Sequence, residues 1–238
     1  MNIDNNFWEE HWHKVNLSIV PPHHPVRRWI ECNVEDSDSE ATCFEIGCFP
    51  AKFLSVFGKK GYTLNGIDMF EDTDLLKPAL TKAGYNVSGV YKVNFLDFET
   101  EDTFDIVCSF GFIEHFKNWK YILKRHVKFA KEGGKILIEV PNLNSPLYKF
   151  LYEILEPRVL DNHVMEVMNL NRISSAFEDE HCFVESKRYL GGFYFRFVTK
   201  HGFFYKVFAL LINIILGPFF NLLPKRVYSR YIGVIAKK

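Results

Sequence analysis

The chain has 238 residues, which is enough for one large domain or for one domain with an elaboration. It carries 29 Lys and Arg against 29 Asp and Glu, so its formal net charge is zero. Broad binding to nucleic-acid phosphates needs a basic excess, and we therefore expect no nucleic-acid partner. The 24 Phe and 11 Tyr predict a Phe-rich core, or else a pocket or membrane-facing surface with exposed rings.

The five cysteines form no Cys-x-x-Cys pair, and no ligand spacing typical of zinc is present. Cys43, Cys48 and Cys108 lie in or beside apolar runs, which is typical of reduced, buried cysteines in a cytosolic protein. We accordingly expect no metal site. The polar and acidic N-terminal residues do not resemble a signal peptide, so a cytoplasmic location is expected. Association with a membrane surface is the alternative that the sequence leaves open.

Residues 1–41 are predicted to form an N-terminal helical lid. Phe7, Trp8 and Trp12 recur at helical spacing, the prolines of residues 21–25 break that pattern, and residues 26–32 follow as a second helix. Residues 42–238 are predicted to form the main domain, with an apolar insertion at 200–226.

Strand-like and helix-like segments then alternate along the chain. The expected strands are 42–47, 62–68, 90–95, 104–109, 135–140, 183–190 and 228–236. The expected helices are 50–59, 74–83, 118–131, 145–155 and 171–179, and the third of them is expected to end at a glycine pair. This alternation predicts an α/β fold with a doubly wound, mostly parallel seven-stranded sheet whose last strand is antiparallel.

Polar and turn residues follow the ends of several expected strands. Glu45, Asp68, Asp97, Ser109 and Pro141 all lie at or just beyond such ends. Ligands of doubly wound sheets bind beyond the carboxyl ends of the strands, so one cleft is expected to collect these residues.

The segment that begins at Glu45 is typical of the strand–turn–helix unit of a nucleotide pocket, but most of the usual glycines are missing. Asp68 lies about twenty residues further on, where a carboxylate accepts hydrogen bonds from ribose hydroxyls. Taken alone, either acid is equally well explained as a helix cap or a surface charge.

Together, these motifs resemble the class I S-adenosylmethionine-dependent methyltransferases over residues 42–190 and the last strand. Residues 45–51 stand where that family has Glu-x-Gly-x-Gly-x-Gly, and residues 66–68 stand at its second-strand acid. Residues 94–98 resemble the adenine-contacting loop, residues 104–116 resemble the fourth strand and its loop, and residues 133–142 resemble the fifth strand.

The resemblance implies S-adenosylmethionine as cofactor and S-adenosylhomocysteine as product. It places Glu45 at the cofactor's ammonium group, Asp68 at the ribose and Asp97 at the adenine amino group. The whole implied cofactor-binding set is Glu45, Gly47, Cys48, Phe49, Asp68, Met69, Asp97, Phe98, Ser109 and Phe110. S-adenosylmethionine has no phosphate, so it does not need a row of close-approach glycines.

The loop after the fourth strand lacks the Asn-Pro-Pro-Tyr motif, which argues against methylation of amide or base nitrogens. Its Glu114-His115 pair recurs in small-molecule methyltransferases, including ubiquinone-type O-methyltransferases. Some of those bind a divalent metal through an earlier carboxylate, but Gly111 stands at that position here.

A hydroxyl acceptor benefits from a general base, usually a histidine. The candidate catalytic residues are His115, His163 and Glu114, although a packing role explains either histidine about as well. His23 and His24 are interpreted as part of a solvated loop.

Residues 202–223 are apolar and long enough for a transmembrane helix. The flanking strands should pair within one sheet, however, and a single crossing would place them on opposite sides of a membrane. The segment is therefore expected to be a core helix, a roof over the acceptor cleft, or an interfacial element whose following cations Lys225, Arg226 and Arg230 suit anionic headgroups.

Residues 160–169 resemble a His-Asn-x-x-x-Met stretch of bacterial glycan-locus methyltransferases, although Asn precedes His here. With the Glu114-His115 pair, this resemblance implies methyl transfer to a hydroxyl of a small molecule, a sugar or a glycan precursor, in surface polysaccharide biosynthesis. The alternatives are a methyltransferase of a quinone or other small metabolite, a nicotinamide-dependent oxidoreductase, and a catalytically silent protein that keeps the cofactor fold. The sequence leaves the acceptor and the oligomeric state open.

Overall fold

The computed structural model describes residues 19–37, 40–200 and 202–238, so the helix expected around residues 7–15 lies outside it. Within the described residues, seven strands form one sheet in the order β3-β2-β1-β4-β5-β7-β6. The strands are β1 (Thr42–Ile46), β2 (Thr63–Asp68), β3 (Val87–Lys92), β4 (Phe104–Phe110), β5 (Ala130–Pro141), β6 (Phe183–Leu190) and β7 (Tyr231–Lys237).

The direction of the strands confirms the predicted fold. β1 to β5 pair in parallel, and β7 lies antiparallel between β5 and β6. The last two strands are neighbours, as expected, with Leu190 opposite Tyr231 and Phe183 opposite Lys237.

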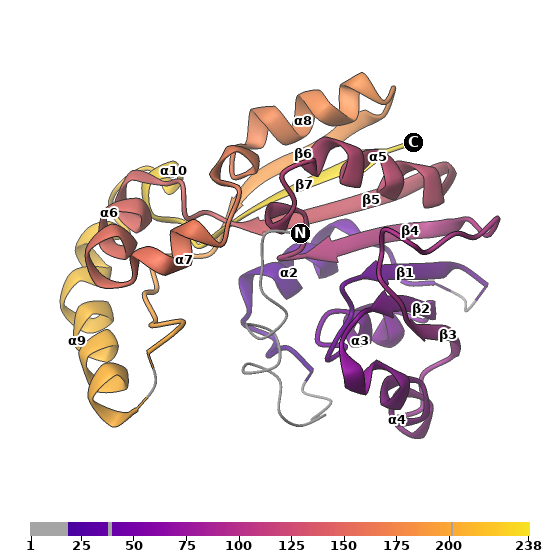
Figure 1. Ribbon diagram of the computed structural model, residues 1–238, viewed down its shortest axis with the longest axis horizontal. Helices are drawn as coiled ribbons and strands as arrows, with labels where there is room; N and C mark the ends of the chain where they lie inside the picture. The colour runs from indigo at the N-terminus through magenta and orange to yellow at the C-terminus, as the bar shows by residue number, and fades with distance from the viewer. Residues whose placement is uncertain (1–18, 38–39, 201) are drawn as a thin grey trace.

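Helices cover both faces of the sheet. In Figure 1, α5 (Trp119–Phe129) and α8 (Leu170–Asp179) lie above it, and α2 (Pro25–Asn33), α3 (Leu54–Lys59) and α4 (Leu76–Lys82) lie below it. A second group gathers at one end of the sheet: α6 (Pro146–Leu155), α7 (Pro157–Asp161), α9 (Phe203–Phe220) and α10 (Lys225–Tyr228). Short 3-10 turns occupy Glu71–Leu75, Ile113–His115 and Met165–Val167.

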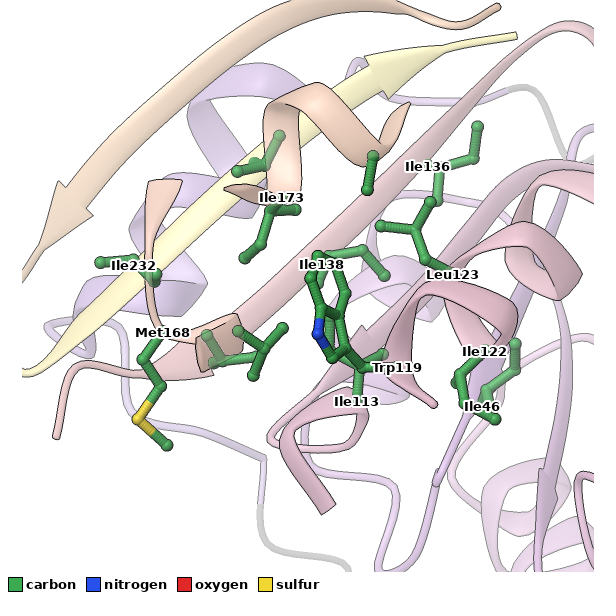
Figure 2. Close-up of a cluster of buried hydrophobic side chains, with 14 of the residues drawn as sticks. Ile46, Ile113, Trp119, Ile122, Leu123, Ile136, Ile138, Met168, Ile173 and Ile232 are labelled. Atoms are coloured by element: carbon green, nitrogen blue, oxygen red, sulfur yellow. The ribbon is translucent and has the colours of Figure 1, made fainter. Parts of the chain in front are cut away.

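Alternation along the strands divides the core between the two faces. Cys43 belongs to the cluster that packs under α2 and α3, whereas its neighbour Phe44 belongs to the cluster under α5 and α8. Leu137 and Ile138 divide in the same way. Figure 2 shows the second cluster, in which isoleucines of the sheet meet Trp119 of α5. Successive side chains of a strand point to opposite faces, so a sheet covered on both sides needs apolar residues at nearly every position.

The third expected helix is shorter than predicted. It ends at Phe129, because Ala130 is extended and begins β5. The glycine pair expected to end the helix lies inside that strand. A Cβ on Gly134 would come within 2.9 Å of the Lys131 carbonyl oxygen and 3.1 Å of the Asp105 carbonyl oxygen, so glycine serves a close approach to β4.

Other boundaries also differ from the prediction, and three of them have a local explanation. α3 begins at Leu54 rather than at residue 50, since Ala51 has a φ of 66°, which no α-helix contains. β3 ends at Lys92, and Asn94 closes the following turn by accepting the Leu96 N–H at 3.0 Å. β7 begins at Tyr231, because the preceding residues form α10.

The apolar insertion is neither a core helix nor a roof over the cleft described below. α9 is the one helix among the described residues that is long and apolar enough to cross a membrane, yet only 11% of its residues are buried. None of residues 203–223 lines the cleft. Because α9 joins the neighbouring strands β6 and β7, a single crossing is incompatible with the sheet.

Candidate functional site

Glu45 is the penultimate residue of β1, and its side chain is 3% exposed. Its Oε2 atom has no hydrogen-bond partner among the described residues. Burial raises the pKa of this carboxyl well above its usual range, and the nearby Asp68 raises it further. A buried polar atom without a partner costs ~1–3 kcal/mol, so this oxygen suits a donor or cation that a ligand brings.

The turn after β1 is fixed by backbone contacts to β2. Gly47 and Cys48 donate their N–H groups to the Ile67 carbonyl at 2.9 and 3.1 Å. Gly47 has a φ of 76°, and a Cβ there would lie 2.7 Å from Cδ2 of Phe112. Backbone conformation and the close approach of Phe112 therefore both require glycine at this position.

Asp68 ends β2 and caps the same turn. Its Oδ2 atom accepts the Phe49 N–H at 2.9 Å, and its Oδ1 atom accepts the Phe70 N–H at 3.0 Å. Burial raises the pKa of this carboxyl, and the two N–H donors lower it. The carboxylate thus already positions the glycine-poor turn.

Phe49 takes the place of a glycine in the family pattern. Its ring packs on Phe70 with the centroids 4.4 Å apart, and the side chain is 8% exposed. The bulky residue therefore has a packing partner of its own beside the turn.

The residues expected at the adenine and at the fourth strand lie in different environments. The Asp97 side chain is exposed, whereas Phe98 stacks on Phe44, and its carbonyl accepts a hydrogen bond from Arg125. Ser109 is fully buried, and its hydroxyl lies 3.0 Å from Nε2 of His126 on α5. The Ser109 side chain therefore faces α5 and not the cleft described next.

A large open cleft of about 1670 Å³ lies beyond the ends of the strands. Typical small-molecule sites occupy ~300–1,000 Å³, so this cleft has room for two molecules side by side. Of the residues predicted from sequence, those that line it are Glu45, Gly47, Cys48, Phe49, Phe110 and Glu114. Those outside its described lining are Asp68, Met69, Asp97, Phe98, Ser109, His115 and His163. Of the five strand-end residues expected to meet in one cleft, Glu45 and Pro141 line it, whereas Asp68, Asp97 and Ser109 do not.

Comparison with known proteins identifies the family. A family model described as "Methyltransferase domain" matches residues 17–193, about three quarters of the chain. The chain belongs to this methyltransferase family. Membership confirms the predicted enzyme class, a class I S-adenosylmethionine-dependent methyltransferase.

Solved structures agree with the fold. A SAM-dependent methyltransferase from Archaeoglobus fulgidus matches with a TM-score of 0.59 and 19% identity, covering 99% of this chain and 100% of that one. Magnesium protoporphyrin IX methyltransferase from Synechocystis PCC 6803, solved with bound S-adenosylhomocysteine, matches with a TM-score of 0.56 and 9% identity, covering 98% and 93%. A search of curated proteins found no match.

Two further buried acids of the methyltransferase line the cleft. Burial raises the pKa of Glu139, on β5, to about 8, and it raises the pKa of Glu114 well above its usual range. Oε2 of Glu114 has no hydrogen-bond partner among the described residues. With Glu45, they give the cleft three buried carboxyls with raised pKa values, and a ligand's cation would stabilise the ionised form of each.

Each of the three carboxyls is expected to lower the free energy of unfolding as the pH rises above the pKa that the carboxyl has in the unfolded state. Their folded-state pKa values are raised, so the folded state keeps protons that the unfolded state loses above its own pKa near 4.5. Buried His24, His115, His126 and His163 have lowered pKa values, so they contribute in the opposite direction until the pH is well above 6.5, and this contribution is the same in wild type and in a carboxyl variant. For Glu139, whose pKa rises to about 8, the slope of the free energy of unfolding is about −1.4 kcal/mol per pH unit near pH 6.5, and it weakens as the pH approaches 8.

Glu139→Gln removes one such slope, and urea denaturation at pH 6.5 and 7.5 measures it. The matched control is Glu132→Gln on the same strand, whose side chain is 85% exposed. Equal pH dependence in both variants would contradict the assignment of Glu139.

His115 and His163 lie against each other, with ring centroids 4.8 Å apart. Nδ1 of His163 lies 2.5 Å from the Val159 carbonyl oxygen and so carries the proton, which leaves its Nε2 as an acceptor. Burial, followed by the proximity of His163, lowers the pKa of His115 to about 3, and burial lowers the pKa of His163. Both rings are therefore neutral at physiological pH.

Glu114, His115 and His163 each offer a ligand atom within 4.8 Å of the others. Two imidazole nitrogens and a carboxylate are ligand types that suit zinc or iron(II). No metal site was expected from the sequence, because Gly111 stands where some related enzymes have a carboxylate. The fold instead brings His163, from the segment after α7, beside Glu114 and His115.

Sequence reasoning missed most of the outer wall of the cleft. This wall is lined by the cations Arg28, Lys52, Arg188, Arg196, Lys225 and Arg230. His24 also lies there rather than in a solvated loop, and its Nδ1 accepts the Val26 N–H at 3.3 Å at the start of α2. These residues come from segments that are far apart in the sequence, and no local motif links them.

Proposed function

We propose that this methyltransferase transfers the methyl group of S-adenosylmethionine to a hydroxyl of a sugar or glycan precursor, in surface polysaccharide biosynthesis. The observation that supports the cofactor part most strongly is Glu45. Its buried, unpartnered oxygen lies at the end of β1 beside Gly47, in a cleft with room for a cofactor and an acceptor. S-adenosylmethionine carries an ammonium and a sulfonium cation, either of which a carboxylate stabilises.

Asp68 and the other predicted residues can still form hydrogen bonds to the ribose, the adenine and the ammonium group of the cofactor. Each Asp68 oxygen accepts one backbone N–H and keeps a lone pair for a ribose hydroxyl. Asp97 and Phe98 are proposed at the adenine, with Met69 and Cys48 beside the ribose and the turn. Ser109 and Phe110 offer backbone carbonyls to the ammonium group.

S-adenosylmethionine, when bound, supplies an electrophilic methyl group for in-line displacement by the acceptor oxygen. The protein's part is to hold that oxygen near the methyl and to take its proton. Glu114 lines the cleft and lies 3.8 Å from Nε2 of His115, which in turn contacts His163. We propose that the cluster of Glu114, His115 and His163 accepts the proton of the acceptor hydroxyl.

If His163 or His115 acts as the base, replacing that residue by Ala lowers turnover by about 100-fold or more, which is typical of a lost general base. Binding of S-adenosylhomocysteine, measured by calorimetry, stays within about twofold of wild type. His181→Ala, on the exposed turn before β6, serves as the control. Near-normal turnover in both variants would show that neither histidine is the base. Dialysis of the wild-type protein against EDTA lowers turnover if the histidines hold a metal, and leaves turnover unchanged if one of them acts as a base.

The acceptor class is tested with isotope-labelled S-adenosylmethionine and panels of sugar nucleotides, lipid-linked sugars, quinones and catechols. Labelled product from a sugar panel alone supports the proposal. Labelling confined to the quinones supports the alternative, a methyltransferase of a quinone or other small metabolite.

We further propose that residues 203–226 contact a membrane surface. One stripe of α9 faces the protein. Ala209 and Gly217 are buried there, and between them the Asn213 side chain accepts the Phe195 N–H and donates to the Phe195 carbonyl, both at 2.7 Å. Asn221, just after the helix, accepts the Phe193 N–H at 2.9 Å.

The rest of α9 is apolar and exposed. Exposure reaches 84% at Phe203, 55% at Leu210 and 61% at Ile214, and Phe150 and Ile154 of α6 add to the same end of the molecule (Figure 1). Lys200, Lys206, Lys225 and Arg226 are exposed in and around the helix. An apolar face with a basic rim suits an anionic membrane surface.

A further inference from the structure

The outer wall of the cleft is cationic along a part of the chain that contains no acid. Residues 191–238 hold no Asp or Glu and eight basic residues: Arg196, Lys200, Lys206, Lys225, Arg226, Arg230, Lys237 and Lys238. Three of these, Arg196, Lys225 and Arg230, line the cleft. They face Lys52 from the turn after β1 and Arg188 from β6.

Arg230 is held in a defined orientation. Its Nη2 donates to the Tyr231 hydroxyl at 2.9 Å, and its guanidinium lies 4.5 Å from the ring centroid of Tyr194 and 5.0 Å from that of Tyr231. Arg196 is exposed at the same wall. Neither arginine forms an ion pair with a carboxylate among the described residues, and both line the cleft.

The wall residues also act on one another. Burial lowers the pKa of Lys52, and the positive charge of Arg196 lowers it further. The pKa of His24 is lowered to about 4. Burial is the largest cause, and the positive charges of Arg230, His23, Lys52 and Arg196 lower it further. The acids of the cleft are buried and have raised pKa values, and the positive charge of Arg230 lowers the pKa of Glu139. The cations of the wall are close enough to repel one another, and an anion bound between them would reduce that repulsion.

We propose that Lys52, Arg196 and Arg230 bind a phosphate or diphosphate group of the acceptor. The proposal rests on the proposed function, because it names the acceptor of the same cleft. Guanidinium groups bind phosphate oxygens through paired, charge-assisted hydrogen bonds. S-adenosylmethionine brings a single carboxylate, which leaves most of this wall to a second ligand. A phosphorylated sugar satisfies both the cationic wall and a hydroxyl acceptor.

The test is calorimetric titration of the full chain with sodium pyrophosphate, with and without S-adenosylhomocysteine. We expect Arg196→Gln and Arg230→Gln each to weaken pyrophosphate binding by about tenfold or more. Lys237→Gln removes a charge from the same acid-free segment outside the cleft, and it should bind as wild type does. Arg230→Lys keeps the charge, so retained binding in that variant separates lost charge from lost packing on Tyr194.

A wild-type protein that binds no pyrophosphate, or an Arg196→Gln variant that binds it as the Lys237→Gln control does, would overturn the proposal. So would variants that lose S-adenosylhomocysteine and keep pyrophosphate, because the wall would then serve the cofactor's carboxylate. Pyrophosphate binding without S-adenosylhomocysteine binding would instead overturn the proposed function and leave the anion site standing.

The phosphate group of the acceptor could belong to a soluble nucleoside diphosphate or to a phosphorylated lipid, and two further experiments distinguish these sources. One arm titrates uridine diphosphate, and the other measures co-sedimentation with phosphatidylcholine vesicles that contain a polyprenyl phosphate, against plain vesicles. Binding in either arm that Arg196→Gln weakens supports the site and identifies its source. If Arg196→Gln changes neither arm, the site is wrong.

Discussion

Replacing Glu45 with Gln is expected to weaken the binding of S-adenosylhomocysteine by about 10- to 100-fold while leaving the fold intact. A hydrogen bond to a charged group contributes ~1.5–3 kcal/mol, and each 1.4 kcal/mol changes affinity tenfold. Gln keeps the shape of Glu, and the unpartnered oxygen of Glu45 has no described contact to lose. Calorimetric titration measures the affinity, and Glu132→Gln on the exposed part of β5 is the control.

The raised pKa of Glu45 adds a second expected result. A cationic ligand favours the ionised carboxylate, so binding should release protons at any pH at which the carboxyl of the free protein is still protonated. Calorimetry in two buffers of different ionisation enthalpy counts them, and Glu45→Gln should reduce the count. Wild-type affinity and unchanged proton release in the variant would show that Glu45 does not hold the cofactor.

Replacing Leu210 and Ile214 together with Glu is expected to reduce binding to phosphatidylglycerol vesicles by about 100-fold or more. Both side chains are more than half exposed on α9, and burying a large aliphatic side chain contributes ~1.5–3 kcal/mol. The new charges would also repel the anionic lipid. Co-sedimentation at low ionic strength measures the effect, and the methyltransferase should lose part of its binding as salt screens the basic rim.

Phe183→Glu is the matched control, because Phe183 is 72% exposed on β6, away from α9. It should bind vesicles as wild type does. If the wild-type protein does not sediment with anionic vesicles at low salt, the membrane proposal is wrong, and the exposed face of α9 needs another partner.

The sequence predicted the sheet well, because each strand carries a local signal. The apolar runs of β1, β4 and β5 are bounded by turn residues, and the expected strand at 183–190 has the observed bounds. Asp68 was identified as the second-strand acid at the end of an apolar run. Its additional task, holding the Phe49 and Phe70 N–H groups, depends on how the turn folds back and has no signature in spacing.

The site could be predicted only where it follows strand ends. Arg196 and Arg230 meet Lys52 across segments separated by more than a hundred residues, and only the fold brings them together. The pairing of His115 with His163 arises in the same way. The burial of α9 was mispredicted because composition alone does not distinguish a core helix from one that faces outward. The stripe of Ala209, Asn213 and Gly217 carries that information, since small and amide side chains allow close contact along one face.

The most direct measurement is calorimetric titration of the wild-type protein with S-adenosylmethionine, S-adenosylhomocysteine and NAD. Glu45, Gly47 and Asp68 predict binding of the first two and no binding of NAD, because the turn lacks the glycines that a pyrophosphate-bridged dinucleotide needs. Binding of NAD alone, or of none of the three, would contradict a cofactor site built on these residues.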